Sequence, residues 1–391
     1  MTMGEIMKKI NVNHLIFYLI VLFSATTVLQ GLPWLGNINK IMMFALLGLL
    51  IVNVFFRKIN RKEIFIIAIT VTLYVFAFLF TENKIDINII FYFMLWVIYF
   101  LYIERNYETI INFAENKTKF IRNVLIFWNI VVGISMFFPS SYKNHLFSPF
   151  ACGEHRFGSC CLMITVLNYI LVIKTRKRSY FRYSIVPIIG IYMCGARTYL
   201  AVYIVLFMCL FYLNCKRKST FYMMLIPVAI MLVLLIKISP VGNKMEETYT
   251  EGYYGVLATV TSGRSQFWTY DLKEFFELNI GKQFVGNGFD FVYNVNYKYI
   301  KKKIWAHNDF INIIMNFGYI GLFVYNYVLF SYSKKIINKN NLKRIQRYSF
   351  YFIWFFNAFF NMVYTYTVAT LAIPFIMYAI CNDYHKIKKL E

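Results

Sequence analysis

Two arginines and one histidine stand in sequence surroundings that suit phosphate and proton chemistry. Arg197 and Arg264 each follow a pair of small residues. A guanidinium group presents a planar fork of donors to phosphate oxygens, and small neighbours allow the phosphate to approach closely. His307 precedes Asn308 at an expected helix start, where a neutral imidazole could accept a proton from an attacking hydroxyl group. The pattern predicts a phosphate site beside a general base.

Each of these residues also has a simpler interpretation. An arginine at a membrane boundary can extend its guanidinium group to lipid headgroups, and a histidine near a helix start can be a capping or interface residue. Convergence of Arg197, Arg264 and His307 at one membrane face would favour the chemical interpretation. Arg156, in an outer loop that also carries His155, is a further candidate for a phosphate contact, although it belongs to no motif.

The composition shows in what kind of protein these residues stand. Of the 391 residues, 59% are apolar and only 15% are charged, against about 25% charged in soluble domains. This excludes a water-soluble globular enzyme, a disordered chain, a disulfide-stapled domain and a single-span receptor. The net charge of +23 lies in short clusters between apolar runs, which is typical of loops at an anionic membrane surface. Membrane lipid is therefore an expected partner, and nucleic acid is not.

The apolar runs predict an all-α fold, a polytopic membrane helical bundle that forms one integral domain over residues 1–391. A crossing needs roughly 20 mostly apolar residues. About twelve transmembrane helices are expected. Two boundaries, around Gly195-Ala196-Arg197 and around Asn361, are compatible with either a tight hairpin or one broken helix. The expected spans are 14–32, 38–56, 64–80, 85–103, 120–138, 158–173, 183–195, 198–214, 220–238, 309–331, 347–361 and 363–380.

Charge asymmetry predicts the orientation of the chain. With a cytoplasmic N-terminus, 27 of the 41 Lys and Arg residues fall on the cytoplasmic side, so both termini are expected there. Residues 239–308 then form one long extracytoplasmic loop. Within it, residues 264–278 place Phe267, Trp268, Leu272, Phe275 and Phe276 on one helical face. This predicts an amphipathic helix lying along the outer membrane surface.

Further residues follow the two arginines in a fixed order. Trp268 comes four residues after Arg264, Gly286 and Gly288 form a glycine turn, and His307-Asn308 is followed by Gly318 and a second glycine three residues later. This ordered set resembles the shared region of the O-antigen ligase and O-antigen polymerase family of bacterial envelope enzymes. The resemblance covers residues 190–325 well and the rest by topology only.

The resemblance implies a multi-pass glycosyltransferase of the bacterial cytoplasmic membrane that acts on undecaprenyl-diphosphate-linked oligosaccharide at the outer face. Arg197 and Arg264 would then hold the diphosphate, and His307 would be the catalytic base. Arg156 and Trp268, with Gly286, Gly288, Asn308 and Gly318, would line or shape the substrate pocket. A chain-length regulator and a flippase are candidate protein partners.

Neither a metal nor a cofactor is expected. A departing diphosphate can be stabilised by cationic side chains alone. The lipid-linked glycosyltransferases that use a metal resemble one another in an acidic residue of the first outer loop. Here that loop, GLPWLGNIN, has no Asp or Glu.

Three functions remain open from the sequence. A polymerase of capsular or O-antigen-like repeat units is favoured, because the richness in Ile, Lys, Asn, Tyr and Phe suggests an A+T-rich genome of the kind common in bacteria without lipid A. A ligase of the O-antigen or teichoic-acid type would use the same donor. A flippase or transporter of the lipid-linked oligosaccharide is the third, although the asymmetric long loop speaks against two related halves.

Overall fold

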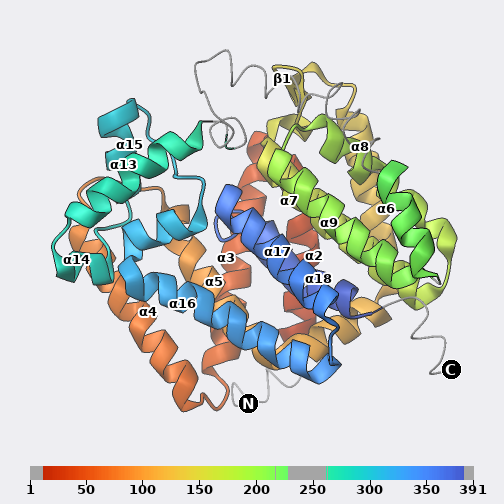
Figure 1. The fold of residues 1–391 in the computed structure, drawn as a ribbon, viewed down its shortest axis with the longest axis horizontal. Coiled ribbons are helices and arrows are strands. Elements are labelled where there is room, and N and C mark those ends of the chain that lie inside the picture. Colours follow the sequence, from red (N-terminus) through yellow and green to blue (C-terminus); the bar gives the residue numbers. More distant parts are fainter. Residues whose placement is uncertain (1–11, 216, 228–260, 262, 383–391) are drawn as a thin grey trace.

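The computed structural model describes residues 12–215, 217–227, 261 and 263–382. Helices dominate these residues, and a short antiparallel hairpin pairs β1 (Tyr142–Lys143) with β2 (Leu146–Phe147). Figure 1 shows the helices packed side by side. The main helices are α2 (Val12–Thr26), α3 (Pro33–Phe55), α4 (Arg61–Phe80), α5 (Ile87–Asn116), α6 (Thr118–Ser135), α7 (Glu154–Thr175), α8 (Ile185–Met193), α9 (Arg197–Asn214), α13 (Arg264–Glu277), α14 (Ile280–Val285), α15 (Phe291–Ile300), α16 (Asp309–Asn340), α17 (Arg344–Phe360) and α18 (Thr367–Cys381).

Eight helices among the described residues are long and apolar enough to cross a membrane. They are α2 with its short continuation to Leu29, α3, α4, α5, α6, α7, α9 and α16. The protein is therefore an all-α, multi-pass membrane protein, as the sequence predicts. The count of twelve spans is not confirmed, because α8, α17 and α18 have 9, 17 and 15 residues. Most of the expected span 220–238 lies outside the described residues.

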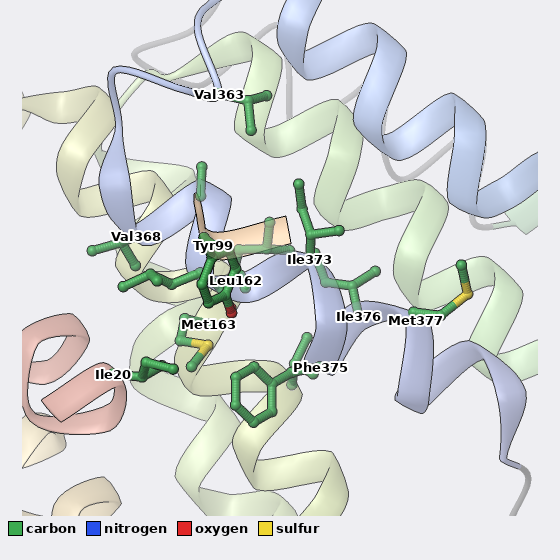
Figure 2. Close-up of a cluster of buried hydrophobic side chains, with 14 of the residues drawn as sticks. Ile20, Tyr99, Leu162, Met163, Val363, Val368, Ile373, Phe375, Ile376 and Met377 are labelled. Carbon is green, nitrogen blue, oxygen red and sulfur yellow. The ribbon is translucent and has the colours of Figure 1, made fainter. Parts of the chain in front are cut away.

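Helix α18 forms the centre of the bundle although it is short. All of its residues are buried, and Figure 2 shows Phe375 and Ile376 of α18 beside Leu162 and Met163 of α7. The Tyr99 hydroxyl of α5 donates a hydrogen bond to a carbonyl oxygen of α18 over 3.0 Å. A helix that is apolar on all sides is stable only when neighbours surround it. Helices α5 and α7 supply that surrounding on two sides.

Opposite charges join helices at one end of the bundle. Lys62 of α4 lies 2.9 Å from Glu104 of α5, and Lys339 of α16 pairs with Glu108 of α5. The sequence assigns these segments to the cytoplasmic side. The opposite end of the bundle holds the starts of α7, α9 and α16 and the connection between α17 and α18. The sequence assigns these segments to the outer loops. Which of the two ends faces outward stays a prediction.

The described part of the long loop is helical. Helix α13 confirms the predicted helix at 264–278, and part of its apolar face packs against the protein. Trp268, Asp271 and Phe275 are buried against α15 and α16, whereas Phe276 is 60% exposed. The exposed side chain of Phe276 leaves the predicted contact of this helix with the membrane surface a prediction. Asp271 lies on the same side of the helix as Trp268 and Phe275.

Two glycines lock α14 against α16. Gly318 interrupts α16 with a φ of 66°, and a Cβ atom there would lie 2.3 Å from the carbonyl oxygen of Phe284. Gly286 has a φ of 86°, and its Cβ would lie 2.2 Å from the carbonyl oxygen of Asn316. Only glycine combines this left-handed backbone with such a close approach. The bond from Asn287 N to the Met315 carbonyl oxygen, 3.0 Å long, closes the contact.

We expect Gly318→Ala to destabilise the protein strongly. The left-handed backbone alone costs an alanine about 1–2 kcal/mol, and the overlap with Phe284 adds to this cost. Melting temperatures of the purified variants in detergent measure the effect. Gly133→Ala in α6 is the matched control, since nothing lies within 4 Å of a Cβ at that position. Equal melting temperatures for both variants would contradict the interlock.

Candidate functional site

The predicted outer end of the bundle brings together residues from four separate segments. We call Arg264, His155, His307 and Asn361 the arginine–histidine cluster. Arg264 Nη2 lies 3.1 Å from His155 Nε2, and the ring centres of His155 and His307 are 6.3 Å apart. The Asn361 amide nitrogen lies 3.3 Å from His155 Nδ1. Thus two of the three residues singled out from the sequence, Arg264 and His307, approach the same imidazole.

Arg264 is fixed by two acceptors at the first turn of α13. Its Nη1 donates to the carbonyl oxygen of Phe360 over 2.9 Å, and its Nη2 donates to His155. Burial lowers the pKa of the guanidinium group, which still keeps its charge because arginine does not deprotonate in proteins. Two of the five N–H donors of this side chain are used in these bonds. The cation is therefore held in place with donors remaining for an anionic ligand.

His155 is held as a neutral imidazole. A guanidinium group can only donate, so Nε2 must be the unprotonated nitrogen and the ring proton lies on Nδ1. The amide of Asn361 faces Nδ1, and its oxygen is buried without another hydrogen-bond partner among the described residues. Rotation of this amide by 180° lets the oxygen accept the Nδ1 proton. Because Arg264 occupies the basic nitrogen, His155 positions the arginine and is poorly placed to act as a base.

His307 lies in a strained loop that is held on both sides. Its φ of 54° is unusual for a residue other than glycine. The preceding Ala306 accepts a hydrogen bond from Trp268 Nε1 over 2.6 Å and donates one from its N–H to the Asn312 side chain over 3.1 Å. The following Asn308 caps α16 through a bond from Ile311 N. Such strain is kept where the surroundings enforce it, often at functional sites.

A bond from Thr198 holds the start of α9, where Arg197 lies, near the cluster. Arg197 is the first residue of α9, and the hydroxyl of Thr198 donates to the carbonyl oxygen of Phe360 over 3.3 Å. The same oxygen accepts the bond from Arg264. The starts of α9 and α13 thus meet at one main-chain atom. The two arginines are therefore close along the backbone, and the convergence of their side chains stays a prediction.

The other predicted residues are not members of the cluster. Arg156 lines a separate cavity. Trp268 and Asn308 support the His307 loop, as described above. The three glycines, Gly286, Gly288 and Gly318, pack against backbone atoms of neighbouring segments. A role of all six residues in binding substrate stays a prediction. The visible contacts of Trp268, Asn308 and the three glycines are with the protein itself.

The sequence did not single out His155, Asn361 or Tyr366. The Tyr366 ring centre lies 5.7 Å from that of His155. His155 belongs to no recognisable motif, and the only signal was its place beside Arg156 in an outer loop. Asn361 marked an uncertain helix break, which the structure resolves as the six-residue connection between α17 and α18.

Comparison with known proteins adds no assignment. No family model matches the chain, and no curated protein matches it. The resemblance to O-antigen ligases and polymerases therefore stays a prediction. Among the described residues, no group of three or more His, Cys, Asp or Glu side chains is arranged to hold a metal ion.

Asp271 gives the packing of α13 a pH-dependent stability. Burial raises the pKa of this carboxyl group from 3.8 to about 8, against a smaller opposite effect of Asn296. At a pH between these two pKa values, the Asp271 carboxyl group is protonated in the folded protein and ionised in the unfolded chain. Stability contributed by this group therefore decreases as the pH rises from about 4 to 8.

We expect Asp271→Asn to be more stable than the unsubstituted protein at pH 8 and to vary less between pH 5 and pH 8. The neutral amide removes the proton linkage while keeping the shape of the side chain. Melting temperatures across this pH range measure the difference. Glu277→Gln, at an exposed position of the same helix, is the control. A pH profile shared by all three proteins would show that Asp271 is not linked to folding.

Proposed function

We propose that the protein transfers a glycan chain from undecaprenyl diphosphate to the hydroxyl group of a lipid-linked repeat unit, and thus polymerises a capsular or O-antigen-like polysaccharide. The observation that carries this proposal is the fixed guanidinium group of Arg264. It contacts the imidazole of His155, whose ring centre lies 6.3 Å from that of His307. A cation beside a candidate base, at the end of a membrane bundle, suits a lipid diphosphate and an attacking sugar hydroxyl.

The proposed reaction divides the work between the arginines and His307. The hydroxyl oxygen of the acceptor forms a bond to C1 of the donor sugar, and the bond from C1 to the phosphate oxygen breaks. The diphosphate leaves with the electron pair, and Arg264 and Arg197 offset its growing charge. His307 accepts the hydroxyl proton. His155 is not assigned this role, because its basic nitrogen already accepts a bond from Arg264.

A ligase would use the same donor and the same residues. The two functions differ in the acceptor, which is a second lipid-linked unit for a polymerase and a different glycan or polymer for a ligase. Polysaccharide from a deletion strain separates them. Single repeat units accumulating on lipid would indicate a polymerase, whereas finished polymer remaining on lipid would indicate a ligase.

Substitution of either arginine tests the diphosphate site. We expect Arg264→Ala and Arg197→Ala to abolish polymer in a producing strain, since a diphosphate in a partly buried site needs compensating charge. Gel electrophoresis of the polysaccharide measures chain length, and immunoblots of membranes confirm that the variants are present. Arg344→Ala, at an exposed position near the opposite end, should leave polymer unchanged. Normal polymer from the Arg264 variant would overturn its role.

His307→Ala should reduce turnover about a hundredfold or more while changing donor affinity little, because a base acts mainly in the transition state. Turnover of purified protein with lipid-linked repeat units gives the first quantity, and binding of undecaprenyl diphosphate gives the second. His145→Ala is a close control, since His145 is an exposed histidine with a φ of 61°. Unchanged turnover in the His307 variant would leave it a purely structural residue.

A further inference from the structure

A cavity of about 390 Å³ lies beside the arginine–histidine cluster. We call it the polar cavity. It is bordered by α2, α3, α5, α7 and α18, and its size falls in the range of small-molecule sites. Arg156, the residue after His155, lines it, and so does Tyr366, whose ring centre is 5.7 Å from that of His155. The cavity and the cluster are therefore neighbours with Tyr366 between them.

The lining of the polar cavity does not suit a lipid chain. Amide and hydroxyl side chains line most of it, and its charged residues are Lys40, Arg156 and Asp86. One carboxylate offsets one of the two cations. A saccharide fits better, because its hydroxyl groups both donate and accept hydrogen bonds. Tyr92 and Tyr366 add aromatic surface for the apolar faces of sugar rings.

Thr365 gives independent support for a ligand. It lines the polar cavity and is 8% exposed. Its hydroxyl oxygen is buried without a hydrogen-bond partner among the described residues. Leaving a buried hydroxyl group unsatisfied is costly, and a native structure rarely does so without a reason. Rotation of the Thr365 side chain toward the cavity would let a hydroxyl group of a bound sugar supply the partner.

We propose that the polar cavity binds the saccharide of the acceptor substrate. This inference rests on the proposed glycan transfer. The diphosphate of the donor is assigned to Arg264, so the second polar space, which adjoins His155 through Tyr366, is left for the other substrate. Tyr366 then stands between the two substrates.

Binding by purified full-length protein in detergent tests this assignment with two probes. The first is the repeat-unit oligosaccharide released from its lipid by mild acid, and the second is undecaprenyl diphosphate without sugar. We expect Tyr92→Leu and Thr365→Val to weaken oligosaccharide binding about tenfold and to leave undecaprenyl diphosphate binding unchanged. Arg264→Ala should show the opposite pattern. Tyr348→Leu, at a position 70% exposed, is the control and should bind both probes normally.

A transfer assay identifies which sugar occupies the cavity. With a lipid-linked donor and the free oligosaccharide as acceptor, the cavity variants should raise the KM for the acceptor and leave the KM for the donor unchanged. A raised KM for the donor alone would overturn the assignment to the acceptor. Normal oligosaccharide binding by the cavity variants, with undecaprenyl diphosphate still bound, would refute the cavity as a saccharide site. If the unsubstituted protein bound neither probe, the proposed function itself would fail.

Discussion

The Asp309 carboxylate holds the candidate site in shape. It is completely buried at the start of α16, and its Oδ2 atom accepts hydrogen bonds from the Tyr325 hydroxyl and from the backbone N–H groups of Val363 and Tyr364, over 2.6, 2.8 and 3.3 Å. These bonds tie the α17–α18 connection to the helix that follows His307. Removing the carboxylate would leave several buried donors unsatisfied, at a cost of about 1–3 kcal/mol each.

That connection supplies Asn361 to the cluster and lies beside its other members. Phe360 precedes it and provides the carbonyl oxygen for Arg264, Asn361 faces His155, and Tyr366 ends it between the cluster and the polar cavity. The positions of the six residues of this connection therefore depend on its bonds to Asp309. The chemistry proposed for the site is performed by side chains, whereas their placement depends on main-chain bonds to a buried acid.

The sequence predicted the parts of the fold that depend on composition. Long apolar runs become helices such as α3, α4 and α7, because a membrane leaves few alternatives for backbone hydrogen bonding. The expected span 183–195 is shorter in the structure. A 3₁₀ segment covers Arg178–Ser184, and α8 has only nine residues. A run of apolar residues does not show where the helix type changes.

Contacts between distant segments could not be predicted from the sequence. The arginines and His307 stood out through their neighbours, but nothing in the sequence linked His155 to Arg264, which lies 109 positions away. The resemblance to the ligase and polymerase family implies that the glycines shape a substrate pocket. The structure shows Gly286 and Gly318 packed against backbone atoms. Asp271 likewise reads as the polar side of an amphipathic helix, although it is fully buried.

The carbonyl oxygen of residue 360 receives donors from both α9 and α13. Because this acceptor belongs to the peptide unit, every amino acid at that position would offer it. Replacement of the phenylalanine ring could alter packing around Trp268 and Phe359 without deleting the acceptor itself. Alignments score the identity of side chains, so such an anchor can persist through divergence while leaving no signature in an aligned column.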